Sequence, residues 1–204
     1  MKISRYTGGV VDTNAYLIQK EGGCVLVDAP QGVIEWLAKL GVKPAALWLT
    51  HSHFDHIMEA AEIQKRFECP VSSHPLARVL LKDPSILKLM GLDVEYPPLV
   101  PDVEVLHGEL LKAEGVSARI LHVPGHSPDS ICFYCEAEGE LFGGDVLMAG
   151  GIGRSDLPGG DGPLLLKGIQ EKIYTLSETV KIHPGHGPST TIGREKATNP
   201  FVRG

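Results

Sequence analysis

The chain has 204 residues and a formal net charge of −6; 43% of its residues are hydrophobic and 22% are charged. This length and composition predict a single domain, residues 1–204, with a substantial buried core. No lysine and arginine cluster stands out, so we expect no nucleic-acid partner. No apolar run approaches the roughly 18–20 residues that cross a bilayer, and the first nine residues lack a signal-peptide pattern. We therefore expect a cytoplasmic protein without a membrane partner.

The first half of the chain begins with a predicted β-hairpin. Two apolar stretches are separated by Glu21-Gly22-Gly23, which is typical of a tight connection between strands. An apolar helical face follows and ends at Gly41, a common residue after a helix C-terminus. We predict these elements in order: strands at 14–19 and 24–28, a helix over 33–40, a strand at 45–50, a helix over 57–67 and a short strand around Val71.

The second half combines short strands with one longer helix. Residues 75–100 are rich in leucine and proline, with two short helical candidates broken at Pro84 and at Pro97-Pro98, and we expect this region to cover the mouth of a site. From Val103 to Phe142, short strands alternate with turns. A helix is predicted from about Pro163 to Leu176. These patterns predict a mixed α and β fold.

The densest group of polar side chains follows the buried strand predicted before residue 51. The segment His51-Ser52-His53-Phe54-Asp55-His56 offers four potential metal ligands within six residues. If the backbone stays extended beyond the strand, His51 and His53 project from the same side and can share one ion. Asp55 and His56 lie where the chain turns into a helical pattern, so they can serve a neighbouring ion.

Three further candidate ligands each follow an apolar strand and a short glycine turn. His126 and His186 come directly after Pro-Gly, and Asp145 comes after Gly143-Gly144. Proline ends the strand and glycine lets the backbone turn tightly, so the side chain is presented from a loop. We therefore expect these strand ends to converge on one cluster.

Together the candidate ligands supply five imidazoles and two carboxylates, a set suited to two divalent metal ions. Zn²⁺ is the expected metal, with iron and manganese as alternatives. In the expected arrangement one ion is held by His51, His53 and His126, and the other by Asp55, His56 and His186. Asp145 bridges the two ions.

Other residues of the same types are expected to be structural. Cys132-Phe133-Tyr134-Cys135 has C-x-x-C spacing, but residues three apart on a strand face opposite sides. We therefore expect buried thiols rather than a redox pair or a zinc site, which fits a reducing compartment. The single histidines that we expect to be ordinary hydrogen-bonded groups are His74, His107 and His122.

The sequence indicates no protein nucleophile. The segment from Gly125 to Asp129 is not a nucleophile elbow, because Asp129 stands where the G-x-S-x-G motif has its last glycine. The segment from Gly151 to Asp156 lacks the last glycine of a dinucleotide fingerprint. We therefore expect metal-bound water to attack the substrate, because two-metal sites lower the pKa of bound water toward roughly 7.

These motifs resemble those of a known family. The pattern His51-x-His53-x-Asp55-His56, with the later His126, Asp145 and His186, resembles the metallo-β-lactamase-fold hydrolase superfamily. The segments Gly153-Arg154-Ser155-Asp156-Leu157-Pro158-Gly159 and Gly193-Arg194-Glu195-Lys196-Ala197-Thr198-Asn199-Pro200-Phe201 resemble its small glyoxalase II-like (hydroxyacylglutathione hydrolase-like) members. The resemblance implies an α/β fold of four layers, the αββα sandwich of that superfamily.

The resemblance also implies an activity. It is that of a metal-dependent thioesterase, which hydrolyses hydroxyacylglutathione-like thioesters through a metal-bound hydroxide. Asp55 and Asp145 would be the catalytic carboxylates and would stay ionised, because a thiolate leaves without a strong general acid. Arg154, which lies in a glycine-rich loop, is expected to pair with a substrate carboxylate. The expected partner is a small thioester or ester, including glutathione conjugates.

Two other functions stay open. Persulfide dioxygenases also resemble this chain, and in that case His51, His126 and Asp145 would hold one non-haem iron. A non-catalytic, metal-stabilised binding domain would keep the ligands without turnover. The chain has Asp28-Ala29-Pro30 where relatives often have Asp-Pro-Gly, and Pro128-Asp129-Ser130 where Pro-Gly is usual. These departures concern the substrate more than the metal ligands.

Overall fold

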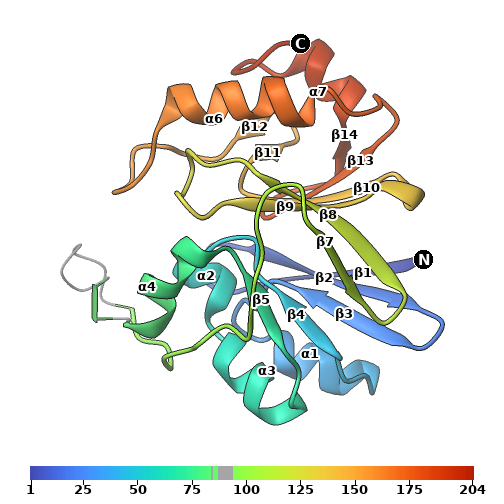
Figure 1. Ribbon diagram of the computed structural model, residues 1–204, viewed down its shortest axis with the longest axis vertical. Coiled ribbons are helices and arrows are strands. Elements are labelled where there is room, and N and C mark those ends of the chain that lie inside the picture. The colour runs from blue at the N-terminus through green and yellow to red at the C-terminus, as the bar shows by residue number, and fades with distance from the viewer. Residues whose placement is uncertain (84, 87–93) are drawn as a thin grey trace. The chain divides into compact units, whose positions relative to one another are not determined.

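The computed structural model describes residues 1–83, 85–86 and 94–204 (Figure 1). They form two compact units, Met1–Val105 with Lys112–Val116 and Leu106–Leu111 with Ser117–Gly204. Each unit combines strands with helices, so the predicted mixed α and β fold is confirmed. The predicted helix break at Pro84 lies outside the described residues.

The first unit is built on a six-stranded sheet in the order β1-β2-β3-β4-β5-β6. The first three strands pair antiparallel and the next three join in parallel. Parallel neighbours need a crossover connection, which the intervening helices provide. The elements are β1 (Lys2–Gly8), β2 (Thr13–Lys20), β3 (Gly23–Val27), α1 (Val33–Leu40), β4 (Ala46–Trp48), α2 (Phe54–Ile57), α3 (Ala60–Phe67), β5 (Val71–Ser73), η1 (Pro75–Ala77), α4 (Arg78–Lys82) and β6 (Val103–Glu104).

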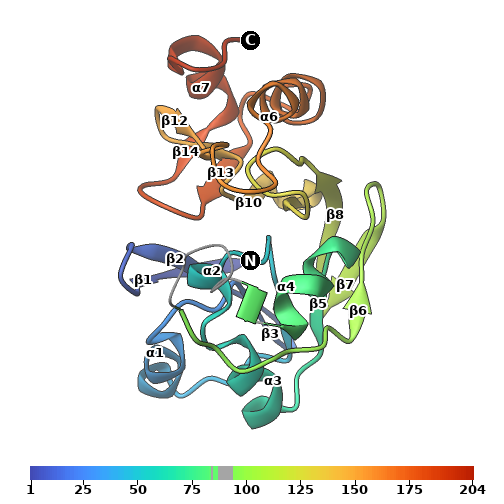
Figure 2. The same cartoon turned by 90° about the vertical axis from the view of Figure 1, so that its left-hand side faces the viewer.

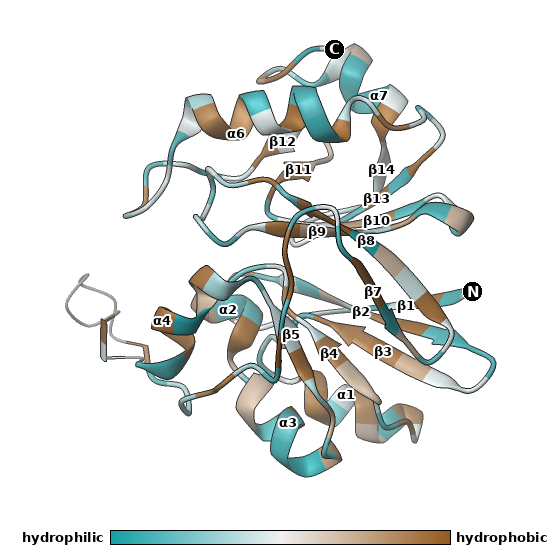
Figure 3. Cartoon of the chain, in the orientation of Figure 1, coloured by the Kyte–Doolittle hydropathy of each residue, from teal (hydrophilic) through white to brown (hydrophobic). Residues whose placement is uncertain are grey.

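The core of this unit forms where apolar helix faces meet the sheet. Helix α1 buries Val33, Ile34 and Leu37, and these residues join a cluster with Leu26 and Leu47 of the strands. Figure 3 shows mostly hydrophobic residues along β3 and β4, whereas α3 alternates between hydrophobic and hydrophilic residues. This alternation is expected of a helix that packs one face on a core.

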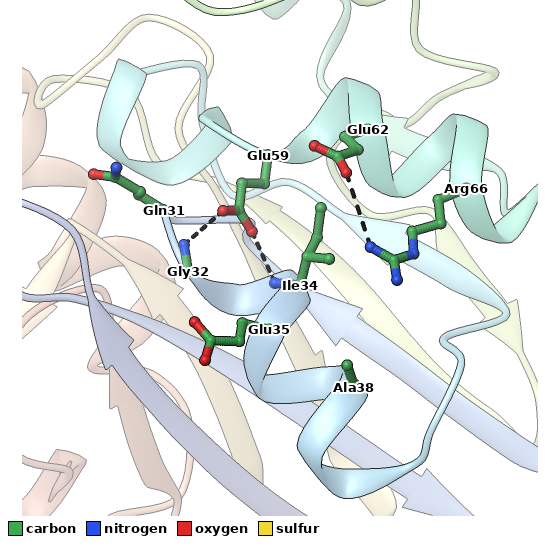
Figure 4. Close-up of a pocket in the computed structure, with 8 residues that line it drawn as sticks. All are labelled: Gln31, Gly32, Ile34, Glu35, Ala38, Glu59, Glu62 and Arg66. Atoms are coloured by element: carbon green, nitrogen blue, oxygen red, sulfur yellow. Dashed lines mark hydrogen bonds and ion pairs between the residues drawn. The ribbon is translucent and has the colours of Figure 1, made fainter.

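The start of α1 is held by a carboxylate from the segment before α3. Glu59 accepts hydrogen bonds from the backbone N–H groups of Gly32, at 2.6 Å, and Ile34, at 2.8 Å (Figure 4). The first N–H groups of a helix lack partners within the helix, so this side chain replaces a capping residue. A pocket of about 480 Å³ lies beside this contact and is lined by α1 and α3 residues including Glu35 and Arg66.

The second unit holds most of the other six-stranded sheet, whose strand order is β14-β13-β10-β9-β8-β7. Helices α6 and α7 lie on the same face of this sheet (Figure 1 and Figure 2). A separate two-stranded ribbon, β11 with β12, follows β10. The elements are β7 (Leu110–Ala113), β8 (Val116–His122), β9 (Ile131–Cys135), η2 (Glu136–Glu138), β10 (Glu140–Gly144), β11 (Leu147–Met148), β12 (Gly151–Ile152), α6 (Gly162–Gly168), the π-helical turn η3 (Ile169–Ile173), β13 (Lys181–Pro184), β14 (Thr190–Thr191) and α7 (Ile192–Thr198).

The core of the second unit packs α6 and η3 on the strands. Leu165 and Ile169 are fully buried and belong to one cluster with Val123, Leu141 and Ile182. The helix predicted from about Pro163 to Leu176 is therefore present as α6 continued by η3. Among the described residues, none of the helices is both long enough and apolar enough to cross a membrane.

The four cysteines are buried thiols, as predicted. Cys132 and Cys135 both lie on β9, where every residue is buried. Burial raises the pKa of Cys132 to about 12 and that of Cys69 to about 11, because the thiolate would lose its hydration. Neither thiol is suited to redox or metal chemistry at neutral pH.

Candidate functional site

In the first unit the candidate ligands occupy the connection between β4 and α2. The strand ends at Trp48, earlier than predicted, but the backbone N–H of Leu49 still bonds to Ser72 O at 2.9 Å. His51 and His53 follow in the loop, with ring centroids 4.7 Å apart and ligand atoms within 4.8 Å of each other. The expectation that this pair projects together is confirmed.

The remaining two candidate ligands of this unit lie in the first turn of α2. His56 is fully buried, and its ring centroid lies 4.2 Å from that of His51. Its Nε2 atom lies 3.3 Å from Asp55 Oδ2. The first unit thus gathers three imidazoles and one carboxylate within a few ångströms.

A buried carboxylate at the end of β3 organises these histidines. Asp28 accepts hydrogen bonds from Thr50 N through Oδ1 and from Thr50 Oγ1 through Oδ2, each at 2.8 Å. The same Oδ2 atom lies 2.8 Å from His56 Nδ1. Because a carboxylate oxygen accepts here, His56 carries a proton on Nδ1, which leaves Nε2 as the nitrogen that can bind a metal.

The same network sets the state of His51. The Thr50 hydroxyl uses its one proton toward Asp28, so it accepts from His51 Nδ1, which is 3.1 Å away. His51 therefore also keeps its lone pair on Nε2. Hydrogen bonds of this kind commonly orient the histidines that bind metals and raise their basicity.

Asp55 has its own neighbour on β2. The buried hydroxyl of Thr13 donates a hydrogen bond to Asp55 Oδ2 at 2.6 Å. This contact joins residues 42 positions apart and fixes the orientation of the carboxylate.

In the second unit, His126 follows a glycine that is required by packing. The backbone of Gly125 has φ of 132°, and a Cβ atom there would lie 2.5 Å from Leu165 N at the start of α6. Asp161 N donates to Gly125 O at 2.7 Å. The helix N-terminus therefore fixes the turn that presents His126.

The ring of His126 is oriented by a backbone carbonyl. His126 Nδ1 lies 2.7 Å from Arg154 O, and because a carbonyl only accepts, Nδ1 carries the proton. His126 Nε2 is then the nitrogen that can bind a metal, and it lies 3.5 Å from Asp145 Oδ2. His126 thus has the same tautomer as His51 and His56.

Asp145 lies between two imidazoles of its own unit. Its Oδ2 atom is 3.3 Å from His186 Nε2 as well as 3.5 Å from His126 Nε2. The loop of His186 is held because Gly185 N donates to Gly144 O at 2.8 Å, next to Asp145. The three strand ends predicted to carry His126, Asp145 and His186 therefore meet within the second unit.

Arg154 lies on the surface and is paired with a neighbour. Its guanidinium makes a bidentate contact with Asp156, at 2.8 and 2.7 Å, and 61% of its side chain is exposed. Hydrogen bonds from Arg154 lower the pKa of Asp156 to about 2, and the pKa of Arg154 is raised in return. A substrate carboxylate would have to replace Asp156 as the partner of this cation.

The three histidines expected to be structural make ordinary hydrogen bonds, as predicted. His74 Nδ1 accepts from Leu76 N at 3.4 Å and caps η1. His107 Nδ1 accepts from His122 N at 3.3 Å, and His122 Nε2 lies 2.8 Å from the backbone oxygen of Pro128.

Two residues that orient the candidate ligands, Asp28 and Thr13, had no role predicted from the sequence. An acidic residue at the end of a predicted apolar strand was the available signal for Asp28, whereas no sequence signal pointed to Thr13.

The donor set fits divalent metal ions chemically. Acceptors at Nδ1 hold the rings of three histidines, so that Nε2 is the nitrogen that can bind a metal. The carboxylates supply hard oxygen atoms. Each unit holds part of this set: His51, His53, Asp55 and His56 in the first, and His126, Asp145 and His186 in the second.

Known proteins are similar to this chain in both sequence and structure. The chain is 36% identical to hydroxyacylglutathione hydrolase GloC of Haemophilus influenzae over 173 residues, covering 83% of this chain and 81% of that one. The crystal structure of the BLEG-1 B3 metallo-β-lactamase matches with a TM-score of 0.90 and 36% identity over the whole of both chains. A di-iron-bound structure of TTHA1623 matches with a TM-score of 0.85 and 36% identity, covering 98% of this chain and 100% of that one.

The sequence pattern of one family spans most of the chain. The metallo-beta-lactamase superfamily matches residues 8–186, which include all seven candidate ligands. The predicted α/β class and metallo-β-lactamase fold are confirmed by this match and by the structural likeness. The chain therefore belongs to the metallo-β-lactamase superfamily.

Proposed function

We propose that this protein is a metal-dependent thioesterase that hydrolyses hydroxyacylglutathione-like thioesters. The observation that carries the proposal is the network of Asp28 and Thr50, which directs the Nε2 lone pairs of His51 and His56 toward ligand positions. The 36% identity to a hydroxyacylglutathione hydrolase supports the thioester substrate. Membership of a superfamily of metallo-hydrolases supports hydrolysis as the reaction class.

We propose that the two units act as one domain, residues 1–204, and bind two divalent ions. One ion would be held by His51, His53 and His126 and the other by Asp55, His56 and His186, with Asp145 shared between them. Zinc is the metal we expect first, and the di-iron form of TTHA1623 supports a two-metal site while keeping iron as an alternative. A cytoplasmic location and the absence of nucleic-acid and membrane partners stay predictions.

The protein residues would contribute orientation and charge. Bound divalent ions would lower the pKa of a coordinated water and polarise the thioester carbonyl. Asp55, held by Thr13, stays ionised as a ligand, and Asp145 has the same role in the second unit. The leaving thiolate is stable enough at neutral pH that no strong acid has to protonate it. Arg154 would exchange Asp156 for a carboxylate of the substrate.

The ligand variants test the proposal against a mononuclear iron dioxygenase. A dinuclear hydrolase predicts that His56→Ala and His186→Ala each lose one metal equivalent and nearly all thioesterase activity. A mononuclear centre of His51, His126 and Asp145 predicts that both variants keep one full equivalent of iron and still consume oxygen with glutathione persulfide. Element-resolved metal analysis of protein purified without added metal, combined with both assays, separates these outcomes.

His107→Ala is the matched control for these variants. This histidine is exposed and makes its hydrogen bond to the backbone of His122, so its loss should change neither metal content nor turnover. Protein that binds metal but turns over no ester, thioester or persulfide would instead indicate a non-catalytic binding domain.

A further inference from the structure

A buried carboxylate in the second unit lies outside the candidate ligand set. Glu195, on α7, is fully buried and accepts hydrogen bonds from Thr190 Oγ1 at 2.5 Å and from Gly150 N and Asn199 Nδ2 at 2.9 Å each. Ionisable side chains are rarely buried without such partners. The partner Gly150 lies in the turn between β11 and β12, so Glu195 ties α7 to that turn.

Asn199 strengthens the same connection. Its Nδ2 atom also donates to Gly151 O at 3.0 Å, and its Oδ1 atom accepts from Phe201 N at 3.0 Å and Val202 N at 3.3 Å. Glu195 and Asn199 therefore bind the N–H group of Gly150 and the carbonyl of the next residue, Gly151, where the turn enters β12. Both side chains are fully buried, so water does not compete for these hydrogen bonds.

The turn leads directly to the contact that orients His126. At Gly153, just after β12, a Cβ atom would lie 1.9 Å from Asp145 O and 2.9 Å from His126 Cγ. The next residue, Arg154, supplies the carbonyl that accepts the hydrogen bond of His126 Nδ1. A shift of the Gly150–Arg154 segment would therefore move the Arg154 carbonyl relative to His126 Nδ1.

We propose that Glu195 is a positioning residue for His126. By fixing the segment from Gly150 to Arg154, it keeps the Arg154 carbonyl against Nδ1 and so keeps the lone pair of His126 on Nε2. The tautomer of a metal-ligating histidine is commonly set by an acceptor at its other nitrogen. The consequence for metal binding rests on the proposed role of His126 as a ligand, whereas the effect on the ring does not.

Two substitutions of Glu195 separate positioning from charge. Glu195→Ala removes the acceptor of Gly150 N and frees the turn. Glu195→Gln can place its amide oxygen at Gly150 N and Asn199 Nδ2, while its amide group donates to Thr190 Oγ1, which has lone pairs to accept. We expect Gln to preserve the network and Ala to break it.

The control removes buried volume from the same helix without touching the network. Ile192 is fully buried on α7, so Ile192→Ala should lower the melting temperature through lost packing. Two readouts compare the variants: long-range ¹H–¹⁵N NMR of the His126 ring in metal-free protein, and zinc affinity by chelator competition. Neither readout needs turnover, so an inactive wild-type protein would refute the proposed function and leave this test intact.

We expect Glu195→Ala to lose the single Nδ1–H tautomer of His126 and to weaken zinc binding about 10–100-fold. Glu195→Gln and Ile192→Ala should both keep the wild-type ring signals and affinity. The inference is overturned if Glu195→Ala keeps the wild-type tautomer and affinity, or if Gln is as defective as Ala. If Glu195→Ala does not fold, Glu195→Asp replaces it in both measurements, because the shorter aspartate side chain cannot reach Gly150 N.

Discussion

Asp28→Asn should disable His56 as a ligand while leaving its ring in place. The amide has the shape of the carboxylate, but one of its two ends now donates. If the oxygen stays at Thr50 N, the amide nitrogen faces His56 Nδ1, which can then only accept. The proton of His56 must move to Nε2, the atom that would bind the metal.

The size of both effects follows from the hydrogen bonds at Asp28. A hydrogen bond to a buried charged group contributes about 1.5–3 kcal/mol, and a donor left facing a donor costs a similar amount. We therefore expect a loss of about 2 kcal/mol of unfolding free energy, which for a chain of this size lowers Tm by about 4–8 °C. Disturbing a group that orients a metal ligand typically weakens metal binding about 10–100-fold.

Glu59→Gln is the matched control for this prediction. Glu59 accepts from the backbone N–H groups of Gly32 and Ile34 in the same unit, so the amide must also face one donor (Figure 4). Its Tm should fall by a comparable amount, while zinc affinity by chelator competition stays at the wild-type value. Equal zinc affinities in Asp28→Asn and Glu59→Gln, or an unchanged Nδ1–H signal of His56 by NMR, would refute the reasoning.

Three further predictions concern other residues of the site. Asp145→Ala should lower zinc content and thioester turnover together, by at least about 10–100-fold; loss of turnover with full metal content would make Asp145 an acid or base instead. Thr13→Val removes the hydroxyl that donates to Asp55 and should weaken zinc binding, whereas Thr13→Ser should restore it; equal affinities for Val and Ser would contradict this role. Arg154→Ala should raise KM for anionic thioesters more than it lowers kcat, and Asp156→Ala, which releases Arg154, should not raise KM; a KM unaffected by Arg154→Ala would leave Arg154 as a surface charge.

The hairpin and the turns that carry the candidate ligands could be predicted because their signals are local. The strands predicted at 14–19 and 24–28 match β2 and β3, and the turns before His126 and His186 follow from Pro-Gly. Strand β1 was missed because it is an edge strand with polar residues such as Ser4 and Arg5, so its sequence shows no apolar run. Its pairing with β2 depends on the rest of the sheet.

Contacts between distant residues account for the remaining differences. The helix predicted over 57–67 is divided into α2 and α3, because Glu59 N bonds to Ala29 O at 3.0 Å and its side chain binds the start of α1. The hydrogen bond between Thr13 and Asp55 and the one between His126 and Arg154 O likewise join separate elements. No local pattern in the sequence reports them.

A zinc titration of metal-free protein tests the central proposal most directly. Aliquots with increasing zinc are assayed with a hydroxyacylglutathione thioester, and the released thiol is followed with a thiol-reactive dye. The four buried cysteines should contribute little background. The dinuclear hydrolase predicts that turnover is absent without metal and saturates at two zinc equivalents. Saturation at one equivalent, or no thioester turnover at any loading with zinc, iron or manganese, would contradict it.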